Sequence, residues 1–103
     1  VLDMLKHYVI FTFEPDFFGP ENLAEFQSVF TRLEQEVPGV LHTEVHQNCV
    51  NRPANMDLMV LMDLADETVL GQYLNHPAHV AMGQKYNPHV TKRVSFDYPT
   101  AAD

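Results

Sequence analysis

The densest group of residues suited to acid–base chemistry spans positions 73–79, with the sequence Tyr-Leu-Asn-His-Pro-Ala-His. Tyr73, His76 and His79 are spaced by three residues, which would place them near one side of a helix. Pro77 fits the first turn of a helix, so we expect a corner between two helices here. A tyrosine and a histidine that is neutral near pH 7 can act as acid and base in an apolar pocket.

A third candidate, His7, lies in the segment Leu5–Glu14, whose β-branched and aromatic residues are typical of a strand. Strand alternation puts His7 on the same side as Val9 and Phe11, the side that we expect to face the helices. We therefore predict that His7 meets the tyrosine and the histidine of the helix corner. The alternative is that these polar side chains only cap a helix or pack in the core.

The pattern His42-x-Glu44-x-His46 places three side chains of metal-ligand type on one face of a strand. The alternative is a polar or solvated edge of an interface, and we predict no metal site. The single cysteine, Cys49, has no neighbouring base in the sequence, so we expect it to be unreactive. The sequence contains no Gly-rich phosphate loop and no C-x-x-C pair, and we predict no cofactor.

Composition limits the kind of protein and its partners. The chain has 103 residues, 46% apolar and 19% charged, which predicts one globular domain over 1–103 with a core of about 4–98. A net charge of −8 argues against nucleic acid and anionic membranes as partners. Apolar runs stay shorter than the roughly 18 residues of a membrane span. Residues 1–4 show no secretory signal, so we expect a reduced, cytoplasmic protein.

Hydrophobic periodicity predicts alternating elements along the chain. Two-residue alternation and β-branched residues indicate strands over 5–14, 40–50, 57–65 and 90–98. Three- and four-residue spacing indicates helices over 21–37, 67–74 and 77–86. The order βαββαβ is the ferredoxin-like pattern, an α+β fold with a four-stranded antiparallel sheet and helices on one face.

The face of this sheet without helices is expected to be apolar, which requires a cover. We predict a homodimer that stacks sheet on sheet as a dimeric α/β barrel. The residues that we expect at the interface are Tyr8, Ile10, Met59, Leu61, Val94 and Phe96.

The chain resembles the stress-responsive α/β-barrel family, also called Dabb, over about residues 4–98. The segments that carry the resemblance are Leu5–Phe13, Glu36-Val-Pro-Gly39, the motif Tyr73-x-x-His76-Pro-Ala-His79 and the ending Phe96-Asp97-Tyr98. The resemblance implies a ferredoxin-like protomer and a homodimer. A plant branch of this family contains polyketide cyclases that close a ring by aldol condensation without a cofactor.

The motif at the helix corner is similar to the cyclase version. The resemblance implies that Tyr73 and His79 act as acid and base and that His7 assists them. His79 would remove a proton alpha to a carbonyl, and the Tyr73 hydroxyl would hydrogen-bond the developing enolate oxygen.

A substrate pocket between the sheet and the helices is expected to be mostly apolar. The residues predicted to contact a ligand are His76, Val9, Phe11, Phe26, Gln27, Phe30, Val60 and Arg93. Two of them depart from an apolar lining. Gln27 aligns with a pocket position of the cyclase helix, and alternation in the last strand turns Arg93 inward. An arginine suits a carboxylate or a phosphate better than an alkyl chain, unless it makes only a surface ion pair or a one-residue bulge reverses the faces.

Three functions are consistent with these residues. The first is a small dimeric protein whose pocket binds a small organic molecule and performs cofactor-free cyclase or lyase chemistry on a carbonyl compound. The second is a structural or stress-protective dimer in which the histidines only satisfy a polar patch. The third is a cofactor-free monooxygenase of the wider dimeric α/β-barrel group, which would follow from the fold alone.

Overall fold

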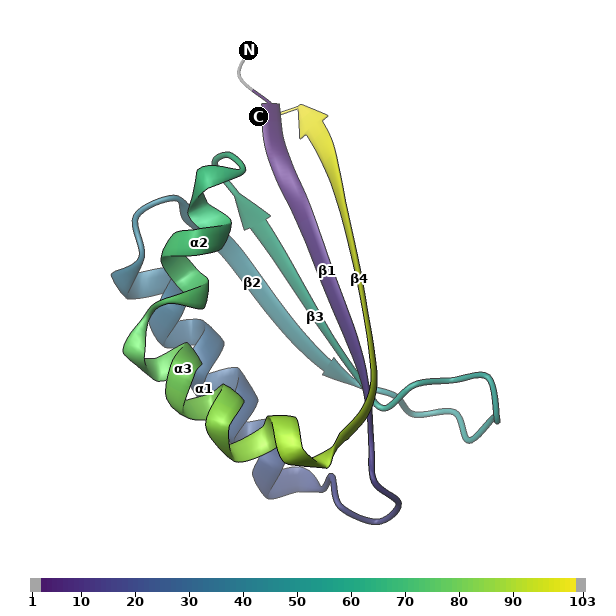
Figure 1. The fold of residues 1–103 in the computed structure, drawn as a ribbon. Coiled ribbons are helices and arrows are strands. Elements are labelled where there is room, and N and C mark those ends of the chain that lie inside the picture. The colour runs from purple at the N-terminus through teal and green to yellow at the C-terminus, as the bar shows by residue number, and fades with distance from the viewer. Residues whose placement is uncertain (1–2, 102–103) are drawn as a thin grey trace.

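Four antiparallel strands form one sheet in the order β2-β3-β1-β4, and the helices cover one of its faces (Figure 1). The computed structural model describes residues 3–101. The elements in chain order are β1 (Asp3–Phe13), α1 (Pro20–Glu36), β2 (Val40–Gln47), β3 (Leu58–Leu64), α2 (Thr68–Leu74), α3 (Pro77–Tyr86), the 3-10 turn η1 (Asn87–His89) and β4 (Val90–Ala101). This is the expected βαββαβ arrangement, and the ferredoxin-like fold is confirmed.

The predicted element boundaries differ from the structure mainly at strand ends. β2 ends at Gln47, three residues before the predicted end, because Asn48 begins a polar loop tied by its own side-chain hydrogen bonds. β4 continues to Ala101, three residues beyond its predicted end, because it pairs with β1 as far as Asp3. Residues 1–2 and 102–103 lie outside the described residues, and they include half of the segment 1–4 in which no secretory signal was predicted.

The core lies between the helices and the inner face of the sheet. β3 alternates strictly between fully buried and half-buried residues, and its inward side chains Val60, Met62 and Leu64 are 0% exposed. α1 turns Phe26, Phe30 and Leu33 onto them, since these residues recur every three or four positions. These side chains of α1 and β3 form the central part of the core.

A tight turn after α1 sets the position of the second helical layer. Gly39 has a φ of +96°, a left-handed conformation that glycine adopts without strain. A Cβ atom at this position would lie 2.6 Å from Cγ2 of Val69 on α2. The glycine therefore allows both the turn into β2 and the close approach of α2.

The outer face of the sheet carries apolar side chains from the three strands β3, β1 and β4. Tyr8 pairs with Leu61 on one side and with Phe96 on the other, and Ile10 pairs with Met59 and Val94 in the same way. Phe96 is 66% exposed, the highest value among the large apolar side chains of residues 3–101. This row continues with Tyr98, whose ring stacks on that of Tyr8 with centroids 6.1 Å apart.

The second strand departs from simple alternation at its start. Alternation alone would place Leu41, Thr43 and Val45 on one buried face. The pairing of β2 with β3 shifts between Val40 and His42, and Leu41 is 50% exposed while Val40 is buried. The irregularity thus corrects the expectation for Leu41 and leaves Thr43 and Val45 on the inner side.

Among residues 3–101, no helix is long and apolar enough to cross a membrane.

Candidate active site

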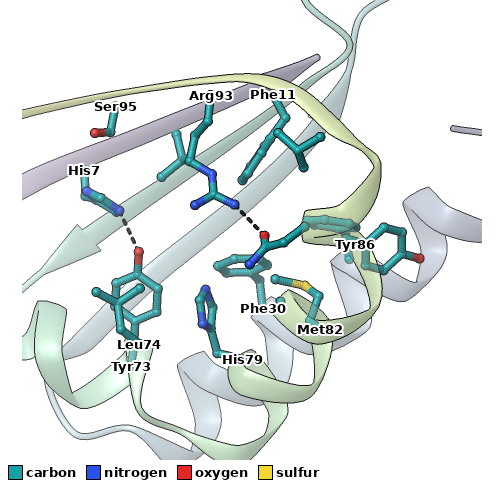
Figure 2. A pocket seen from close by; sticks show the side chains of 15 residues that line it. His7, Phe11, Phe30, Tyr73, Leu74, His79, Met82, Tyr86, Arg93 and Ser95 are labelled. Atoms are coloured by element: carbon teal, nitrogen blue, oxygen red, sulfur yellow. Dashed lines mark hydrogen bonds between the residues drawn. The ribbon is translucent and has the colours of Figure 1, made fainter. Parts of the chain in front are cut away.

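A cavity of about 230 Å³ lies between the sheet and the helices on the side of β1 and β4 (Figure 2). The sheet supplies its floor, and α1, α2 and α3 supply its walls. The lining residues are His7, Val9, Phe11, Phe26, Phe30, Tyr73, Leu74, His79, Met82, Gly83, Tyr86, Asn87, Val90, Arg93 and Ser95. The three residues predicted to carry acid–base chemistry, His7, Tyr73 and His79, all line it.

Tyr73 and His7 form a buried pair at one end of the cavity. The Tyr73 hydroxyl lies 2.6 Å from Nε2 of His7, and the two residues are 2% and 6% exposed. α2 points Tyr73 inward because it shares a face with Val69, four residues earlier, which is also buried. His7 points inward from β1, as strand alternation predicted.

Asp97 completes this group from β4. It pairs with His7 across the two strands, and its Oδ1 atom lies 2.5 Å from Nδ1 of His7. A carboxylate only accepts hydrogen bonds, so Nδ1 carries the proton and donates it. Neutral His7 then accepts a hydrogen bond from the Tyr73 hydroxyl at Nε2, whereas charged His7 donates Nε2–H to the Tyr73 oxygen and leaves the hydroxyl hydrogen free.

Asp97 was absent from the predicted site, although Phe96-Asp97-Tyr98 was among the segments of the family resemblance. A signal was available in the alternation of the last strand. Asp97 shares a face with Arg93, which was expected to point inward. What the sequence alone did not supply is the register that sets Asp97 opposite His7.

Burial and charge set the protonation of Tyr73. Burial raises the pKa of the Tyr73 hydroxyl well above its usual value of 10.0, and the negative charge of Asp97 adds to the rise. The positive charge of Arg93 opposes it. Tyr73 therefore keeps its proton near neutral pH and is suited to donate a hydrogen bond.

His79 faces Tyr73 from α3. The two rings meet edge to face with centroids 5.2 Å apart, and the ring of Phe30 packs against His79 in the same manner. Burial lowers the pKa of His79 below its usual 6.5, while a hydrogen bond to the Leu74 backbone partly offsets this effect. His79 is therefore a neutral imidazole near pH 7, the form that can accept a proton.

Arg93 enters the cavity from β4 at the end away from His7. Its guanidinium carbon lies 5.3 Å from the centroid of the Phe11 ring, and its Nη2 atom donates to Oδ1 of Asn87 at 2.5 Å (Figure 2). The strand keeps the predicted alternation at this point, because the shift in pairing between β1 and β4 falls later on β1, between Thr12 and Phe13.

The predicted ligand contacts divide into two groups. Val9, Phe11, Phe26 and Phe30 line the cavity, as does Arg93. Gln27, Val60 and His76 do not. Gln27 is exposed on α1, with its side chain 3.5 Å from the carbonyl oxygen of Val45, because the helix turns its neighbour Phe26 inward instead. Val60 is fully buried in the core beneath α1.

His76 has a structural position at the start of α3. Its Nδ1 atom accepts a hydrogen bond from the backbone N–H of Ala78 at 3.1 Å, so Nε2 carries the proton and donates to Glu36 at 3.0 Å. This is the helix cap that the sequence left as an alternative for these histidines. The corner at Pro77 thus separates a capping histidine from the one that faces the cavity.

The three polar residues on β2 form hydrogen bonds at the surface, with Glu44 between the two histidines. The two carboxylate oxygens of Glu44 lie 3.0 Å from Nε2 of His42 and 2.9 Å from Nε2 of His46. These hydrogen bonds lower the pKa of Glu44, the one from His46 most strongly. Within residues 3–101 no group of three or more His, Cys, Asp or Glu side chains is arranged to hold a metal ion. Cys49 is exposed.

The βαββαβ sheet with helices on one face and a cavity between the two layers defines an α+β protein with the ferredoxin-like fold. The model of the stress responsive A/B barrel domain matches residues 5–100. The chain therefore belongs to this family. Comparison with curated proteins finds no match.

Solved structures share the fold at low sequence identity. A dimeric protein of unknown function from Bacteroides fragilis is 23% identical, with a TM-score of 0.77, over 94% of this chain and 96% of that chain. A Dabb family protein from Mesorhizobium loti is 23% identical, with a TM-score of 0.66, over 97% and 99%. A hydroxynitrile lyase from Passiflora edulis is 9% identical, with a TM-score of 0.75, over 100% and 98%.

Proposed function

We propose that the cavity binds a small carbonyl compound and performs cofactor-free acid–base chemistry on it, of the lyase or cyclase class. The observation that carries this proposal is the meeting of two groups of opposite character in one apolar cavity. Near pH 7 the Tyr73 hydroxyl is protonated and the His79 imidazole is neutral, and the centroids of the two rings lie 5.2 Å apart. This is the pair required to polarise a carbonyl and to remove a neighbouring proton.

The reaction begins with a proton transfer to His79. A neutral imidazole nitrogen takes a proton from the carbon alpha to the carbonyl, and the electron pair of that C–H bond forms a C=C bond. The π electrons of the carbonyl move to its oxygen, where the Tyr73 hydroxyl donates a hydrogen bond to the enolate. The enolate carbon then either takes the proton back from His79 or attacks a second carbonyl in the same molecule. In the second case the π electrons of that carbonyl form an alkoxide, which takes the proton from His79.

His7 and Asp97 position Tyr73 for this role. When His7 is charged, its Nε2–H donates to the Tyr73 oxygen, so the hydroxyl hydrogen is free for the substrate. Asp97 balances that charge through Nδ1. The group therefore resembles other triads in which a carboxylate holds a histidine in the required orientation.

Two similarities support the assignment. The motif from Tyr73 to His79 resembles that of the plant polyketide cyclases in the family. The hydroxynitrile lyase from Passiflora edulis has the same fold, so this architecture accommodates a lyase.

The test is hydrogen exchange at the alpha carbon of ketones. Acetophenone and a set of aliphatic and oxo-acid carbonyl compounds are incubated with the protein in D₂O, and deuterium incorporation is followed by NMR. We expect His79→Gln and Tyr73→Phe to lower the enzymatic exchange rate by about 100-fold or more. His46→Gln, which changes an exposed histidine on β2, is the matched control and keeps the wild-type rate.

Two outcomes contradict the proposal. One is exchange by His79→Gln at the wild-type rate. The other is a wild-type rate that never exceeds that of buffer across neutral and anionic ketones. The second outcome favours a structural or stress-protective dimer, the alternative that the exposed outer face supports independently of the cavity. The monooxygenase-like alternative follows from the fold alone.

We also propose that the protein is a homodimer formed by the outer face of the sheet. Phe96, Val94 and Tyr98 are 66%, 41% and 37% exposed, and they adjoin apolar residues of β1 and β3 in one continuous surface. Stacking two such faces about a two-fold axis would cover both. The proposed interface consists of Tyr8, Ile10, Met59, Leu61, Val94 and Phe96. The protein of the same fold from Bacteroides fragilis is described as dimeric.

A further inference from the structure

The cavity has an uneven distribution of charge. Among the described residues that line it, Arg93 is the only one that is charged at every physiological pH, and none is a carboxylate. The remaining lining is mostly aromatic and aliphatic. A chain with a net charge of −8 thus places an arginine in the cavity between the sheet and the helices.

We propose that the ligand is an oxo acid, whose carboxylate binds Arg93 while its carbonyl oxygen binds Tyr73. The inference rests on the proposed function, because it names the substrate class of the same site. It adds a second anchoring point, supplied by β4, to the hydrogen bond from Tyr73.

The guanidinium group of Arg93 is held in place without being neutralised. It stacks over Phe11 and gives one N–H to the Asn87 side-chain oxygen, which carries no charge. Within residues 3–101 no carboxylate lies within 4.0 Å of the guanidinium to form an ion pair with it. Arg32 on α1, by contrast, forms an ion pair with Glu36. A guanidinium has five N–H donors, so several remain for a ligand.

The charge of Arg93 reaches the acid–base pair. Burial is the main cause that lowers the pKa of His79, and the charge of Arg93 adds to it. The same charge opposes the rise in the pKa of Tyr73. Arg93 is therefore close enough to hold one end of a small ligand while the other end contacts Tyr73 and His79 (Figure 2).

The spacing of residues on β4 indicates how the two ligand groups are separated. Arg93 pairs with Phe11, and Asp97 pairs with His7. The two pairs are therefore four residues apart along each of the antiparallel strands. Four residues of a strand span about 13 Å. The carboxylate and the carbonyl of the ligand are therefore expected on different carbons with a spacer between them, and the long side chains of Arg93 and Tyr73 shorten the gap that this spacer has to bridge.

A carboxylate fits this surrounding better than a phosphate. Either anion can form a two-pronged contact with a guanidinium. A phosphate carries a charge near −2 and usually binds several cations or a row of backbone N–H groups. The cavity offers one guanidinium beside apolar walls, which matches an anion of single charge joined to an apolar body.

The test compares an acid with its neutral twin. The probes are 4-oxo-4-phenylbutanoate and the corresponding primary amide, which have nearly the same shape and differ in charge. Their dissociation constants are measured by NMR titration for the wild type, Arg93→Gln, Arg93→Lys and Lys92→Gln. Lys92 lies next to Arg93 on β4 and alternates to the other side of the strand, so it controls for the loss of one positive charge.

We expect the wild type and Lys92→Gln to bind the acid about 10- to 100-fold more tightly than the amide. Arg93→Gln should lose this preference for the acid and bind the amide as the wild type does. Arg93→Lys should keep part of the preference, because it retains the charge and loses the two-pronged contact. Unchanged amide binding shows that the variants fold and keep the cavity.

Three results would overturn the inference: no binding of the acid to the wild type, equal binding of acid and amide, or an acid affinity that Arg93→Gln leaves unchanged. Competition by inorganic phosphate at least as strong as by the acid would overturn the carboxylate assignment. Deuterium exchange in the same samples separates this inference from the proposed function. Exchange without a preference for the acid removes only the inference, whereas Arg93-dependent binding without exchange of any carbonyl compound removes only the acid–base chemistry.

Discussion

The two faces of the sheet are built from the same strands and have opposite character. On the inner face, His7 and Tyr73 are 6% and 2% exposed and share a hydrogen bond in a cavity beneath the helices. On the outer face, Phe96, which precedes the Asp97 that pairs with His7, is 66% exposed in a row of apolar side chains. The inner face therefore holds buried, hydrogen-bonded polar groups, while the outer face presents apolar groups to the solvent.

This contrast separates two tasks within one small chain. Polar groups that are buried and hydrogen-bonded can have shifted pKa values, which is what acid–base chemistry requires. Exposed apolar groups contribute a favourable free energy only when another surface covers them and removes them from water. We accordingly place the chemistry on the inner face and the assembly on the outer face. The predictions that follow test this division.

The largest effect is expected from a charge on the outer face. Ile10→Asp places a carboxylate at the centre of the proposed interface, where its desolvation opposes association. We expect the dimer to give way to monomer or aggregate in sedimentation velocity. Val80→Asp, at an exposed apolar position on α3, is the control and should leave the assembly unchanged. An Ile10→Asp protein that sediments as the wild-type dimer would refute the proposed interface.

A second comparison uses two methionines of β3 that lie on opposite faces. Met62 is 0% exposed under the helices, and Met62→Ala should lower the free energy of unfolding by about 2–5 kcal/mol at any protein concentration. Met59 lies on the outer face, and the cost of Met59→Ala should increase with protein concentration as the dimer forms. Urea unfolding at two concentrations measures both. Equal concentration dependence of the two differences from wild type would contradict the assignment of faces.

A smaller effect is expected from the buried hydrogen bond between His7 and Tyr73. Tyr73→Phe leaves Nε2 of His7 without its partner, and His7→Leu leaves the Tyr73 hydroxyl without one, at about 1–3 kcal/mol each. The double variant should cost less than the sum of the two, with a coupling of about 0.5–3 kcal/mol. Thermal and urea unfolding of the four proteins provide the cycle. Strict additivity would show that the two residues do not interact.

The smallest effect concerns pH. Burial lowers the pKa of folded His79 below the usual 6.5, so the unfolded chain binds more protons as the pH falls past that value. The contribution of His79 to stability is therefore fully present above pH 6.5 and is lost as the pH falls through the lowered pKa. We expect His79→Gln to lose less stability than the wild type in this range. Gln84→Ala, an exposed change on the same helix, should keep the wild-type slope, and an identical slope for His79→Gln would contradict the shift.

Periodicity predicted most of the fold because each element has one dominant repeat. The stripe Phe26, Phe30 and Leu33 indicated α1, and the alternation of Val60 and Met62 indicated β3. The family resemblance and the pattern agreed on the order of elements. Leu41 was placed wrongly because a shift in strand pairing depends on contacts between strands, which one strand's pattern does not contain.

The candidate site was predictable to the extent that it depends on local spacing. The helix corner indicated Tyr73 and His79, and alternation indicated the inward direction of His7 and Arg93. Asp97 was missed because its contact with His7 joins residues 90 positions apart. Gln27 was included through an aligned helix position, yet the rotation of α1 turns it to solvent.

The register between β1 and β4 also constrains how such a chain can evolve. His7 and Tyr8 are adjacent in sequence, as are Phe96 and Asp97, and each pair divides between the two faces. Substitutions on one face can accumulate with little effect on the other, so ligand preference and assembly can diverge separately. Deleting one residue from either strand would exchange the two faces beyond that point. Insertions and deletions among related chains are therefore expected in the loop between β2 and β3, and their exclusion from β1 and β4 would mark selection on both tasks at once.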